Sequence, residues 1–488
     1  MLLNRTFVMK HKFSLVLVLT SMIFYFVFAY SLIRTDHTKL IGLYLGLFVL
    51  CYKLIQTHKN NIQFLSYIAF GFRAIFIVAT PNLSQDFYRF IWDGRMILEG
   101  FNPYLYTVES FISNAKFPVA QSQELYQGMG TFNANHYSNY PPVNQFFFVI
   151  SGLFGSDTIL GTVLSMRFLI IAADLGTLYF GKKLLQCLGL PSYHILWYIL
   201  NPFIIIELTG NLHFEGVMLF FLTWSLYLIH KGRWQWAAVV FALSITVKLI
   251  PLLFLPLFYQ YFIKNNTRLQ HATNDAENTP KKKPTPSITK PCTPLKIKLT
   301  GWLQLSGFYG IVFLVTLLLF VPFFSIQFAN NYTKTLALWF QNFEFNASIY
   351  YVIREIGYLF RGNNEIAIIG KYTAIIVCFS VIILAFFRKN NTMVQLISAM
   401  LIALSLYYFT ATTVHPWYIA TLLLLSVFTN YKFPLIWSVV IILSYLSYTQ
   451  SNTINKHENL WIIGLEYFIV YIAFFKDLFK LKSRERQH

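Results

Sequence analysis

One segment of the chain reads Ser84-Gln85-Asp86-Phe87-Tyr88-Arg89-Phe90-Ile91-Trp92-Asp93-Gly94-Arg95 and continues to Gly100-Phe101-Asn102-Pro103-Tyr104. At helical spacing, Asp86, Arg89 and Asp93 share one face, while apolar side chains cover the other. Gly100 and Pro103 end the predicted helix. Such a helix is too polar to cross a bilayer and too apolar to leave it, so we expect it to lie at the membrane surface. Its charged face would present a carboxylate where a lipid headgroup can meet a water-soluble partner.

The rest of the chain is typical of a protein that crosses a membrane many times. Of its 488 residues, 56% are hydrophobic and 12% are charged, and apolar runs of spanning length recur from end to end. The net charge of +19 comes from lysine and arginine in short connecting segments. In a membrane protein this charge reports topology and contact with anionic lipid. We therefore expect membrane lipids, and no nucleic acid, among the partners.

The basic residues also predict the orientation of the spans. Arg5, Lys10 and Lys12 precede the first apolar run, and a basic tail at 480–486 follows the last one. The positive-inside rule places both ends in the cytoplasm. The apolar runs between them predict an all-α bundle of about 13–14 transmembrane helices, with 14 preferred because both ends lie on one side. The run at 143–154 is too short for a span and is expected to lie along the outer surface.

This topology divides the chain into five segments. Residues 1–80 are N-terminal transmembrane helices, and 81–157 form an extracytoplasmic loop with amphipathic surface helices that carry the acidic motif. Residues 158–263 are a transmembrane core. Residues 264–300 are rich in proline and lysine and are predicted to be a disordered, basic cytoplasmic linker. Residues 301–488 are C-terminal transmembrane helices with an external loop at about 327–364.

With this orientation, the unusual polar clusters fall at or near one surface. They are Asp86 and Asp93, Tyr140-Pro141-Pro142, the run from Gly210 to Glu215, Lys248, the run from Asn346 to Tyr350, and His415-Pro416-Trp417. Charged groups within a bilayer are unfavourable and usually mark function. A surface that collects acids, histidines and a lysine indicates an active site on the extracytoplasmic side. No metal-ligand spacing stands out, so we expect neither a metal nor a cofactor.

Several of these motifs resemble those of the polyprenyl-phosphate-sugar-dependent glycosyltransferases with the GT-C fold, especially bacterial mannosyltransferase-like members. The matching features, in chain order, are Asp86 to Tyr104, Tyr140-Pro141-Pro142, Lys248-Leu249-Ile250-Pro251, Phe345-Asn346-Ala347-Ser348 and Val414-His415-Pro416-Trp417-Tyr418. The ordered set is more specific than any one motif. Two positions depart from the pattern: Gln85 precedes Asp86 where many relatives have a second acid, and Asn211 to Glu215 replaces a Gly-His-x-Asp pattern.

The resemblance implies an integral-membrane hexosyltransferase of the bacterial cytoplasmic (inner) membrane. It would move a hexose, with mannose as the expected sugar, from a polyprenyl-phosphate donor to an extracytoplasmic glycan or lipid-linked acceptor, with inversion. An acceptor hydroxyl would attack the anomeric carbon, and the lipid phosphate would leave. A carboxylate can take the hydroxyl proton, and cations can stabilise the charge that develops on the phosphate.

Carried onto matching positions, the resemblance implies Asp86 as the catalytic base and Asp93 as a second catalytic candidate. It implies substrate-binding or donor-binding roles for Arg89, Arg95, Asn102, Tyr104, Tyr140, His213, Glu215, Lys248, Asn346, Tyr350, His415 and Trp417. Simpler structural interpretations remain open. Asp86 could cap its helix or pair with Arg89, Asp93 could pair with either neighbouring arginine, and Lys248 could reach the membrane interface.

A multi-spanning transporter or lipid-linked sugar flippase is the alternative function. Such proteins place ionisable groups near the midplane of broken helices, and an internal repeat relates their halves. Arg73, Arg167 and Asp174 within predicted spans, and the proline break at Pro251, favour this alternative. The sequence shows no internal repeat, and its unusual charges cluster at one face. These two features favour the enzyme.

Overall fold

The structure is a computed structural model that describes residues 5–155, 157–264, 301–341, 343–446 and 458–485. These residues form helices and contain no β-strand; a single parallel bridge joins Phe345 and Thr413. Six helices are long and apolar enough to cross a membrane, namely Lys12–Ser31, His37–His58, Ile159–Cys187, Gly301–Phe323, Ile366–Phe387 and Met393–Thr410. A bent pair, Pro202–Gly210 and Glu215–His230, makes up to seven. The prediction of an all-α polytopic membrane protein is therefore confirmed.

Shorter apolar helices account for the larger number of spans predicted from sequence. They contain 10–17 residues each and are Ile62–Ile75, Pro142–Phe154, Trp234–Val247, Ile250–Lys264, Pro416–Val427 and Phe433–Leu446. The predicted total of about 13–14 treated most of these as complete crossings, which their length alone does not support. All but the first residue of the predicted linker at 264–300 lies outside the described residues, so that assignment stays a prediction.

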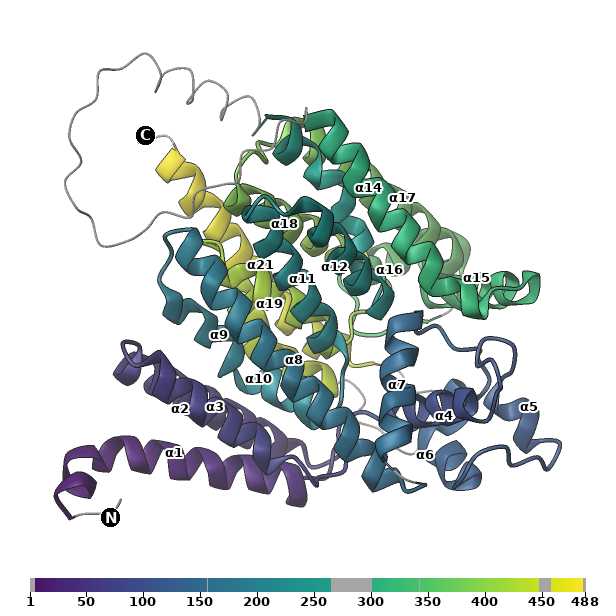
Figure 1. Ribbon diagram of the computed structural model, residues 1–488, viewed down its shortest axis with the longest axis horizontal. Helices are drawn as coiled ribbons and strands as arrows, with labels where there is room; N and C mark the ends of the chain where they lie inside the picture. The colour runs from purple at the N-terminus through teal and green to yellow at the C-terminus, as the bar shows by residue number, and fades with distance from the viewer. Residues whose placement is uncertain (1–4, 156, 265–300, 342, 447–457, 486–488) are drawn as a thin grey trace.

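The N-terminal helices α1 (Arg5–Ser31), α2 (His37–His58) and α3 (Ile62–Ile75) lie together at one side of the bundle (Figure 1). An ion pair ties them to the core. Arg73, in the last turn of α3, contacts Asp174 of α8 (Ile159–Cys187) with an Nε–Oδ2 distance of 2.7 Å, and both side chains are fully buried. A buried charge requires such a partner, so this pair has a structural role.

The core contains a broken helix that positions part of the site. Short helices η1 (Ser192–Ile195), α9 (Leu196–Ile199) and α10 (Pro202–Ile204) lead into the π-helix η2 (Ile205–Gly210), and α11 (Glu215–His230) then departs at 115°. Arg167 of α8 donates hydrogen bonds to the carbonyls of Thr209 and Gly210 at the break, and to that of Ile77. Helix ends leave carbonyls without intrahelical partners, so this guanidinium stabilises the break.

The next two elements bring Lys248 to the same end of the molecule. Helix α12 (Trp234–Val247) ends where Lys248 takes an extended conformation, with φ −147° and ψ 139°. The prolines at 251 and 256 then favour the 3₁₀ helix η3 (Ile250–Leu257) over a regular α-helix. The lysine is therefore held at a chain reversal instead of within a continuous span.

The outer segment contains α4 (Asp86–Leu98), α5 (Val108–Ile112), α6 (Ser122–Ala134) and α7 (Pro142–Phe154). Helix α4 ends before Gly100, whose φ of +80° favours glycine, as the sequence predicts. Helices α4 and α7 cross closely, since a Cβ at Gly94 would lie 2.5 Å from the carbonyl oxygen of Phe148. The structure encloses Arg89 and Asp93 of the charged face, because α6 and the chain that follows it cover that part of α4.

The C-terminal part packs beside this core (Figure 1). Its elements are α14 (Gly301–Phe320), η4 (Val321–Phe323), α15 (Ile326–Gln341), α16 (Ile349–Arg361), α17 (Ile366–Phe387), α18 (Met393–Thr410), η5 (Pro416–Tyr418), α19 (Ile419–Val427), α20 (Phe433–Val440), η6 (Ile441–Leu446) and α21 (Leu460–Glu485). The segment predicted as an external loop at 327–364 is largely helical, since it contains α15 and α16.

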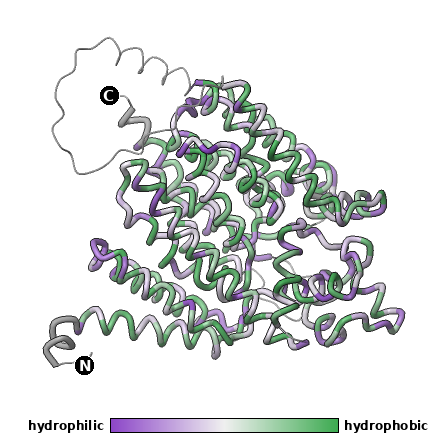
Figure 2. Tube along the Cα trace, viewed as in Figure 1, coloured by the Kyte–Doolittle hydropathy of each residue, from purple (hydrophilic) through white to green (hydrophobic). Residues whose placement is uncertain are grey.

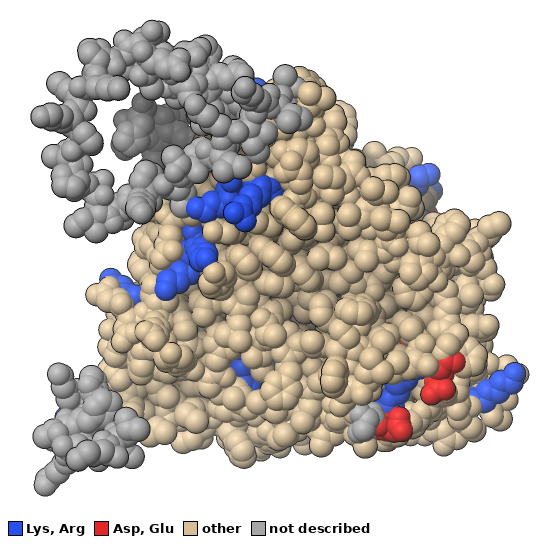
Figure 3. All heavy atoms as spheres, in the orientation of Figure 1, with Lys and Arg blue, Asp and Glu red and all other residues tan. Residues whose placement is uncertain are grey.

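Apolar residues dominate the long helices, while hydrophilic residues gather at helix ends and around α4 to α6 (Figure 2). The charges are also separated on the face that Figure 3 shows. Basic side chains gather toward the upper left of that face, whereas the acidic ones lie at the lower right, near α4 to α7, with other basic side chains beside them. The outer segment therefore differs in charge from the opposite end of the bundle.

Candidate active site

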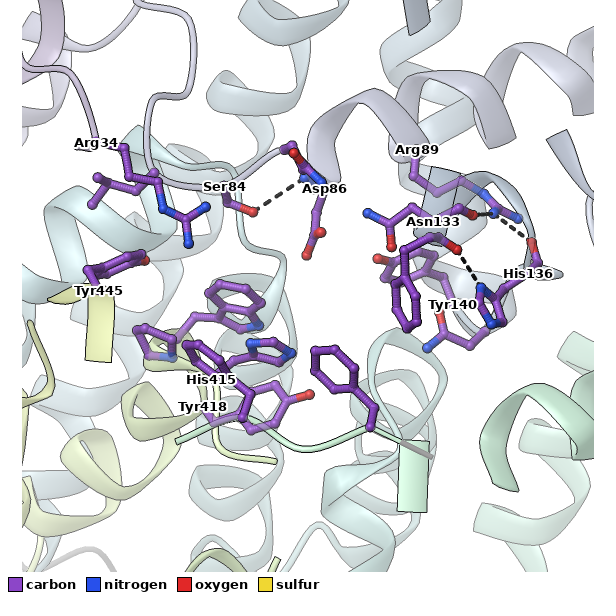
Figure 4. A pocket seen from close by; sticks show the side chains of 18 of the residues that line it. Arg34, Ser84, Asp86, Arg89, Asn133, His136, Tyr140, His415, Tyr418 and Tyr445 are labelled. Atoms are coloured by element: carbon purple, nitrogen blue, oxygen red, sulfur yellow. Dashed lines mark hydrogen bonds between the residues drawn. The ribbon is translucent and has the colours of Figure 1, made fainter. Parts of the chain in front are cut away.

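A cavity of about 790 Å³ lies between the start of α4, the chain after α6, Lys248 and the C-terminal elements (Figure 4). Its ionisable lining residues are Arg34, His37, Asp86, Arg89, His136, Lys248, Glu344 and His415, and its aromatic ones are Phe132, Tyr137, Tyr140, Phe343, Phe345, Trp417, Tyr418 and Tyr445. This volume is typical of a site for a small organic ligand. Within the described ranges, no group of three or more His, Cys, Asp or Glu side chains is arranged to hold a metal ion.

Asp86 is the first residue of α4, and its side chain points into this cavity between two groups of lining residues. Arg34 and Tyr445 lie on one side of it in Figure 4, and Asn133 and His136 lie on the other. Its backbone N–H donates to Ser84 Oγ at 3.3 Å, which fixes the start of the helix.

The protein environment makes the Asp86 carboxylate more basic than usual. Burial raises its pKa to about 6, and the nearby Glu215 adds to the rise. Lys248, Arg34 and a hydrogen bond with the side chain of Asn133 act in the opposite direction and lower the pKa. A carboxyl group with this pKa is ionised at neutral pH and can accept a proton.

Asp93 lies on the same helix but in a different environment. It is fully buried, does not line the cavity and pairs with Arg89 at an Nε–Oδ1 distance of 2.7 Å. Its other oxygen accepts hydrogen bonds from Ser138 Oγ at 2.5 Å and Gln145 Nε2 at 3.0 Å. Every oxygen of Asp93 is thus engaged, whereas Asp86 faces open space. The structure separates the two acids that the sequence grouped together.

The same ion pair shapes one wall of the cavity. Arg89 donates to the backbone carbonyls of Asn133 and His136, each at 2.8 Å. Together with the bond from Ser138 to Asp93, these contacts fix the chain that leaves α6. The Arg89–Asp93 pair therefore acts on the site by holding the segment 133–138 in place.

Two cations face the cavity near Asp86. Lys248 Nζ lies 3.0 Å from Glu215 Oε1 and 5.2 Å from the centre of the Tyr140 ring, and 20% of its side chain is exposed. Arg34, between α1 and α2, is exposed, and its guanidinium carbon lies 5.4 Å from the centre of the Tyr445 ring. The cavity can therefore hold an anionic group next to a carboxylate.

A stack of rings forms another wall. The indole of Trp417 lies between two imidazoles, with ring centres 3.7 Å from His213 and 4.6 Å from His415. His415 also stacks on Phe345, which the bridge to Thr413 brings alongside. Burial lowers the pKa of His415 to about 3, with Lys248 and Arg34 as smaller causes, so this imidazole is neutral at physiological pH.

The structure brings six of the predicted site residues together at the cavity, namely Asp86, Arg89, Tyr140, Lys248, His415 and Trp417. The other eight do not line it, namely Asp93, Arg95, Asn102, Tyr104, His213, Glu215, Asn346 and Tyr350. His213 and Glu215 lie directly behind it, in contact with Trp417 and Lys248. Tyr350 donates to Glu344, a lining residue, at 2.7 Å and so supports the site indirectly.

The remaining predicted residues make contacts within the outer segment, between it and the bundle, and within the C-terminal part. Arg95 donates to the carbonyl of Ala120 at 2.7 Å, and Asn102 donates to that of Phe323 at 3.1 Å. The Tyr104 hydroxyl donates to the carbonyl of Tyr140 at 2.5 Å, and its ring packs among Phe323, Phe328 and Tyr332. Asn346, with φ +46°, donates to Glu466 at 3.2 Å. These contacts are structural, so the sequence motifs mark packing as well as chemistry.

Sequence reasoning missed several lining residues: Arg34, Asn133, His136, Glu344 and Tyr445. A signal existed only for Arg34, which follows the first apolar run. The predicted topology places it outside, against the positive-inside rule, and such an exception indicates function. The others lie in segments without periodicity or a motif.

Residues 19–264 match a family model described as alpha-(1->6)-mannopyranosyltransferase, N-terminal domain. The match spans half of the 488 residues. The chain belongs to this family. Together with the helices of membrane-spanning length, membership makes it a membrane mannosyltransferase and confirms the resemblance seen in the sequence. No curated protein and no solved structure matches the chain.

The matched region supplies only part of the cavity of this mannosyltransferase. Arg34, Asp86 and Lys248 lie within it, whereas Glu344 and Trp417 lie in the C-terminal half. The cavity therefore forms where the family's N-terminal domain packs against the rest of the chain.

Proposed function

We propose that this mannosyltransferase takes mannose from a polyprenyl-phosphate donor and transfers it, with inversion, to a hydroxyl of an extracytoplasmic glycan or glycolipid. Asp86 is the general base. The observation that carries the proposal is the placement of the Asp86 carboxylate beside two cations, Lys248 and Arg34, in a single cavity. A transfer reaction with an anionic leaving group needs these two kinds of group together.

The choice of base rests on a comparison of the two carboxylates that line the cavity, Asp86 and Glu344. Glu344 accepts hydrogen bonds from Arg354 at 2.6 Å, Tyr350 at 2.7 Å and Asn364 at 3.3 Å. Those bonds occupy both oxygens of Glu344 and leave it less available to accept a proton from an acceptor hydroxyl. Asp86 has a pKa of about 6, which suits a base that works near neutral pH.

The proposed step is a single displacement. The acceptor oxygen bonds to the anomeric carbon of mannose as its proton passes to the Asp86 carboxylate. The bond between that carbon and the phosphate oxygen breaks, and its electron pair leaves with the polyprenyl phosphate. Lys248 and Arg34 stabilise the negative charge that gathers on the phosphate. One displacement inverts the configuration at the anomeric carbon.

We also propose that the cavity faces outward in a bacterial cytoplasmic membrane, with both termini in the cytoplasm. The charge separation in Figure 3 supports this orientation, because lysine and arginine concentrate on the cytoplasmic side of membrane proteins. Labelling of single cysteines placed at Gln121 and Lys282 tests it. Gln121 should react from outside and Lys282 from inside, and reaction of both from one side would overturn the orientation.

The observations that favoured a transporter now have structural explanations. Arg73 and Asp174 neutralise each other in the core, and Arg167 caps backbone carbonyls at the broken helix. None of the three lines the cavity. The intramembrane charges therefore stabilise the fold and do not form a transport path.

The direct test supplies the purified protein in lipid nanodiscs with polyprenyl-phosphate mannose and a mannan-type oligosaccharide acceptor. We expect mannosyl transfer with an inverted anomeric configuration, and release of polyprenyl phosphate in equal amount. Polyprenyl-phosphate glucose and arabinose serve as matched donors that should react more slowly. Transfer from a nucleotide-sugar in place of the lipid-linked sugar would contradict the proposed donor.

Replacement of Lys248 with methionine should raise the KM for the donor about 10- to 100-fold, the range for losing a charge-assisted hydrogen bond. Lys248→Arg should retain part of the affinity, because it keeps the charge. Lys182→Met is the matched control, since Lys182 is an exposed lysine far from the cavity on α8. An unchanged donor KM in Lys248→Met would mean that this lysine does not bind the phosphate.

A further inference from the structure

Arg34 differs from Lys248 and Arg89, the other two basic residues that line the cavity, in how it is held. Lys248 has a carboxylate partner at 3.0 Å, whereas Arg34 has no ion-pair partner among the described residues. Its guanidinium instead lies over the ring of Tyr445 at 5.4 Å. The free hydrogen-bonding capacity of an arginine beside a cavity suits a phosphate group.

Tyr445 is in turn hydrogen-bonded to a buried acid, Glu207. Its hydroxyl donates a hydrogen bond of 2.9 Å to Glu207 Oε1, and both residues are almost completely buried. The link joins segments far apart in the sequence, because Tyr445 lies in η6 and Glu207 in η2. This hydrogen bond fixes the position of the phenol ring over which the Arg34 guanidinium lies.

Glu207 lies in an unusual backbone conformation, and one oxygen of its side chain lacks a hydrogen-bond partner. Glu207 lies in the π-helix η2, a feature that often marks functional sites. Its other oxygen, Oε2, has no hydrogen-bond partner and lies 3.8 Å from Nε2 of His213, which also lacks one. An incompletely paired carboxylate in the core is unfavourable for stability. A role in the site explains why an acid occupies this position.

We propose that Glu207 is a positioning residue that acts through Tyr445 to orient Arg34 toward the donor phosphate. The inference rests on the proposed function, since it concerns binding of the same donor. The broken helix then supports both Lys248 and Arg34. Glu215 holds Lys248 directly, while Glu207 holds Arg34 through an aromatic ring that keeps the guanidinium available for the ligand.

Kinetics of variants at these positions test the inference. Glu207→Met removes the carboxylate without leaving a new buried polar group, and it should raise the donor KM about fivefold while kcat stays within twofold. Glu207→Gln can still accept the bond from Tyr445 and should restore part of the affinity. Tyr445→Phe keeps the ring and should have a smaller effect than Tyr445→Leu, which removes it. Tyr44→Phe, which deletes a buried hydroxyl bonded to Ser438 away from the cavity, should leave KM unchanged.

A double-mutant cycle decides whether Glu207 acts through Arg34. In the Arg34→Met background, Glu207→Met should change the donor KM by less than 1.5-fold, because the residue it positions is gone. An equal fivefold effect in both backgrounds would overturn the inference. Should Glu207→Met fail to fold, the same cycle with Tyr445→Leu and Arg34→Met gives the answer.

Binding of polyprenyl monophosphate to the protein in nanodiscs separates this inference from the proposed function. A wild-type protein that binds this lipid, with a Kd unaffected by Glu207→Met, would overturn the inference alone. A wild-type protein that neither binds it nor transfers mannose from it would overturn the proposed function, and the inference with it.

Discussion

Replacement of Asp86 with asparagine is expected to lower kcat by about 10²–10⁴, the range for loss of a general base. Asparagine keeps the size of the side chain and its ability to accept a hydrogen bond, but it cannot take a proton from the acceptor hydroxyl. The donor KM should change little, because the cations that bind the phosphate remain. Measurement of kcat and donor KM with polyprenyl-phosphate mannose separates the two effects.

The pH profile provides an independent readout of the same residue. Since the pKa of Asp86 is raised to about 6, its carboxylate is ionised above that pH and protonated below it. Only the ionised form can act as base, so kcat/KM for the wild type should fall as pH drops through about 6. The residual activity of Asp86→Asn should lack this acidic limb.

The controls exclude unfolding as the cause. Burial disfavours the charged form of Asp86, so a neutral amide there should leave the thermal midpoint unchanged or slightly raised. Glu124→Gln, an exposed acid of the same outer segment, should retain full activity. Full activity of Asp86→Asn with loss of activity in Asp93→Asn would move the base to Asp93. Full activity of both variants would refute a catalytic role for α4.

The sequence was sufficient to predict the helical membrane fold and the bounds of α4. Apolar runs and the terminal lysines and arginines carry that information locally, and Gly100 ends α4 through its own backbone preference. The ordered motifs predicted the family, and three of their residues, Asp86, Lys248 and Trp417, line one cavity in the structure.

The pairing of charges could not be predicted in the same way. Arg89 has two acidic neighbours at helical spacing, Asp86 and Asp93, and only the tertiary structure selects Asp93. That choice depends on Ser138 and Gln145, which close over the pair from outside the helix. For this reason the sequence alone did not predict that Arg89 and Asp93 are enclosed.

Contacts between distant segments explain the other omissions. The Arg34 guanidinium contacts the ring of Tyr445, although most of the sequence separates the two residues. Neither residue lies in a motif. Glu207 occurs within an apolar run that predicts a regular span, so its place in a π-helix could not be predicted from the sequence. By contrast, Tyr104 belongs to a motif, yet it packs against Phe328 and Tyr332 and does not line the cavity.

Replacement of Asp93 with alanine should mainly lower the stability of the protein, whereas Asp86→Asn should mainly lower kcat. It leaves Arg89 buried without its anionic partner and removes the acceptor of Ser138 and Gln145. Breaking a buried ion pair from one side destabilises a protein by about 3–5 kcal/mol. We expect a large fall in the thermal midpoint in nanodiscs, together with a weakened substrate site as the segment 133–138 loses its support.

A second substitution distinguishes this explanation from a catalytic role. Replacing both partners, as Arg89→Met with Asp93→Leu, removes the unpaired charge and should recover part of the thermal midpoint lost in Asp93→Ala. Glu99→Gln, an exposed acid just after α4, is the control and should leave the midpoint unchanged. Asp93→Asn keeps an acceptor for Ser138, so its midpoint should lie between those of Asp93→Ala and the wild type. A normal midpoint in Asp93→Ala combined with loss of kcat alone would show that Asp93, although enclosed in the present structure, takes part in the reaction.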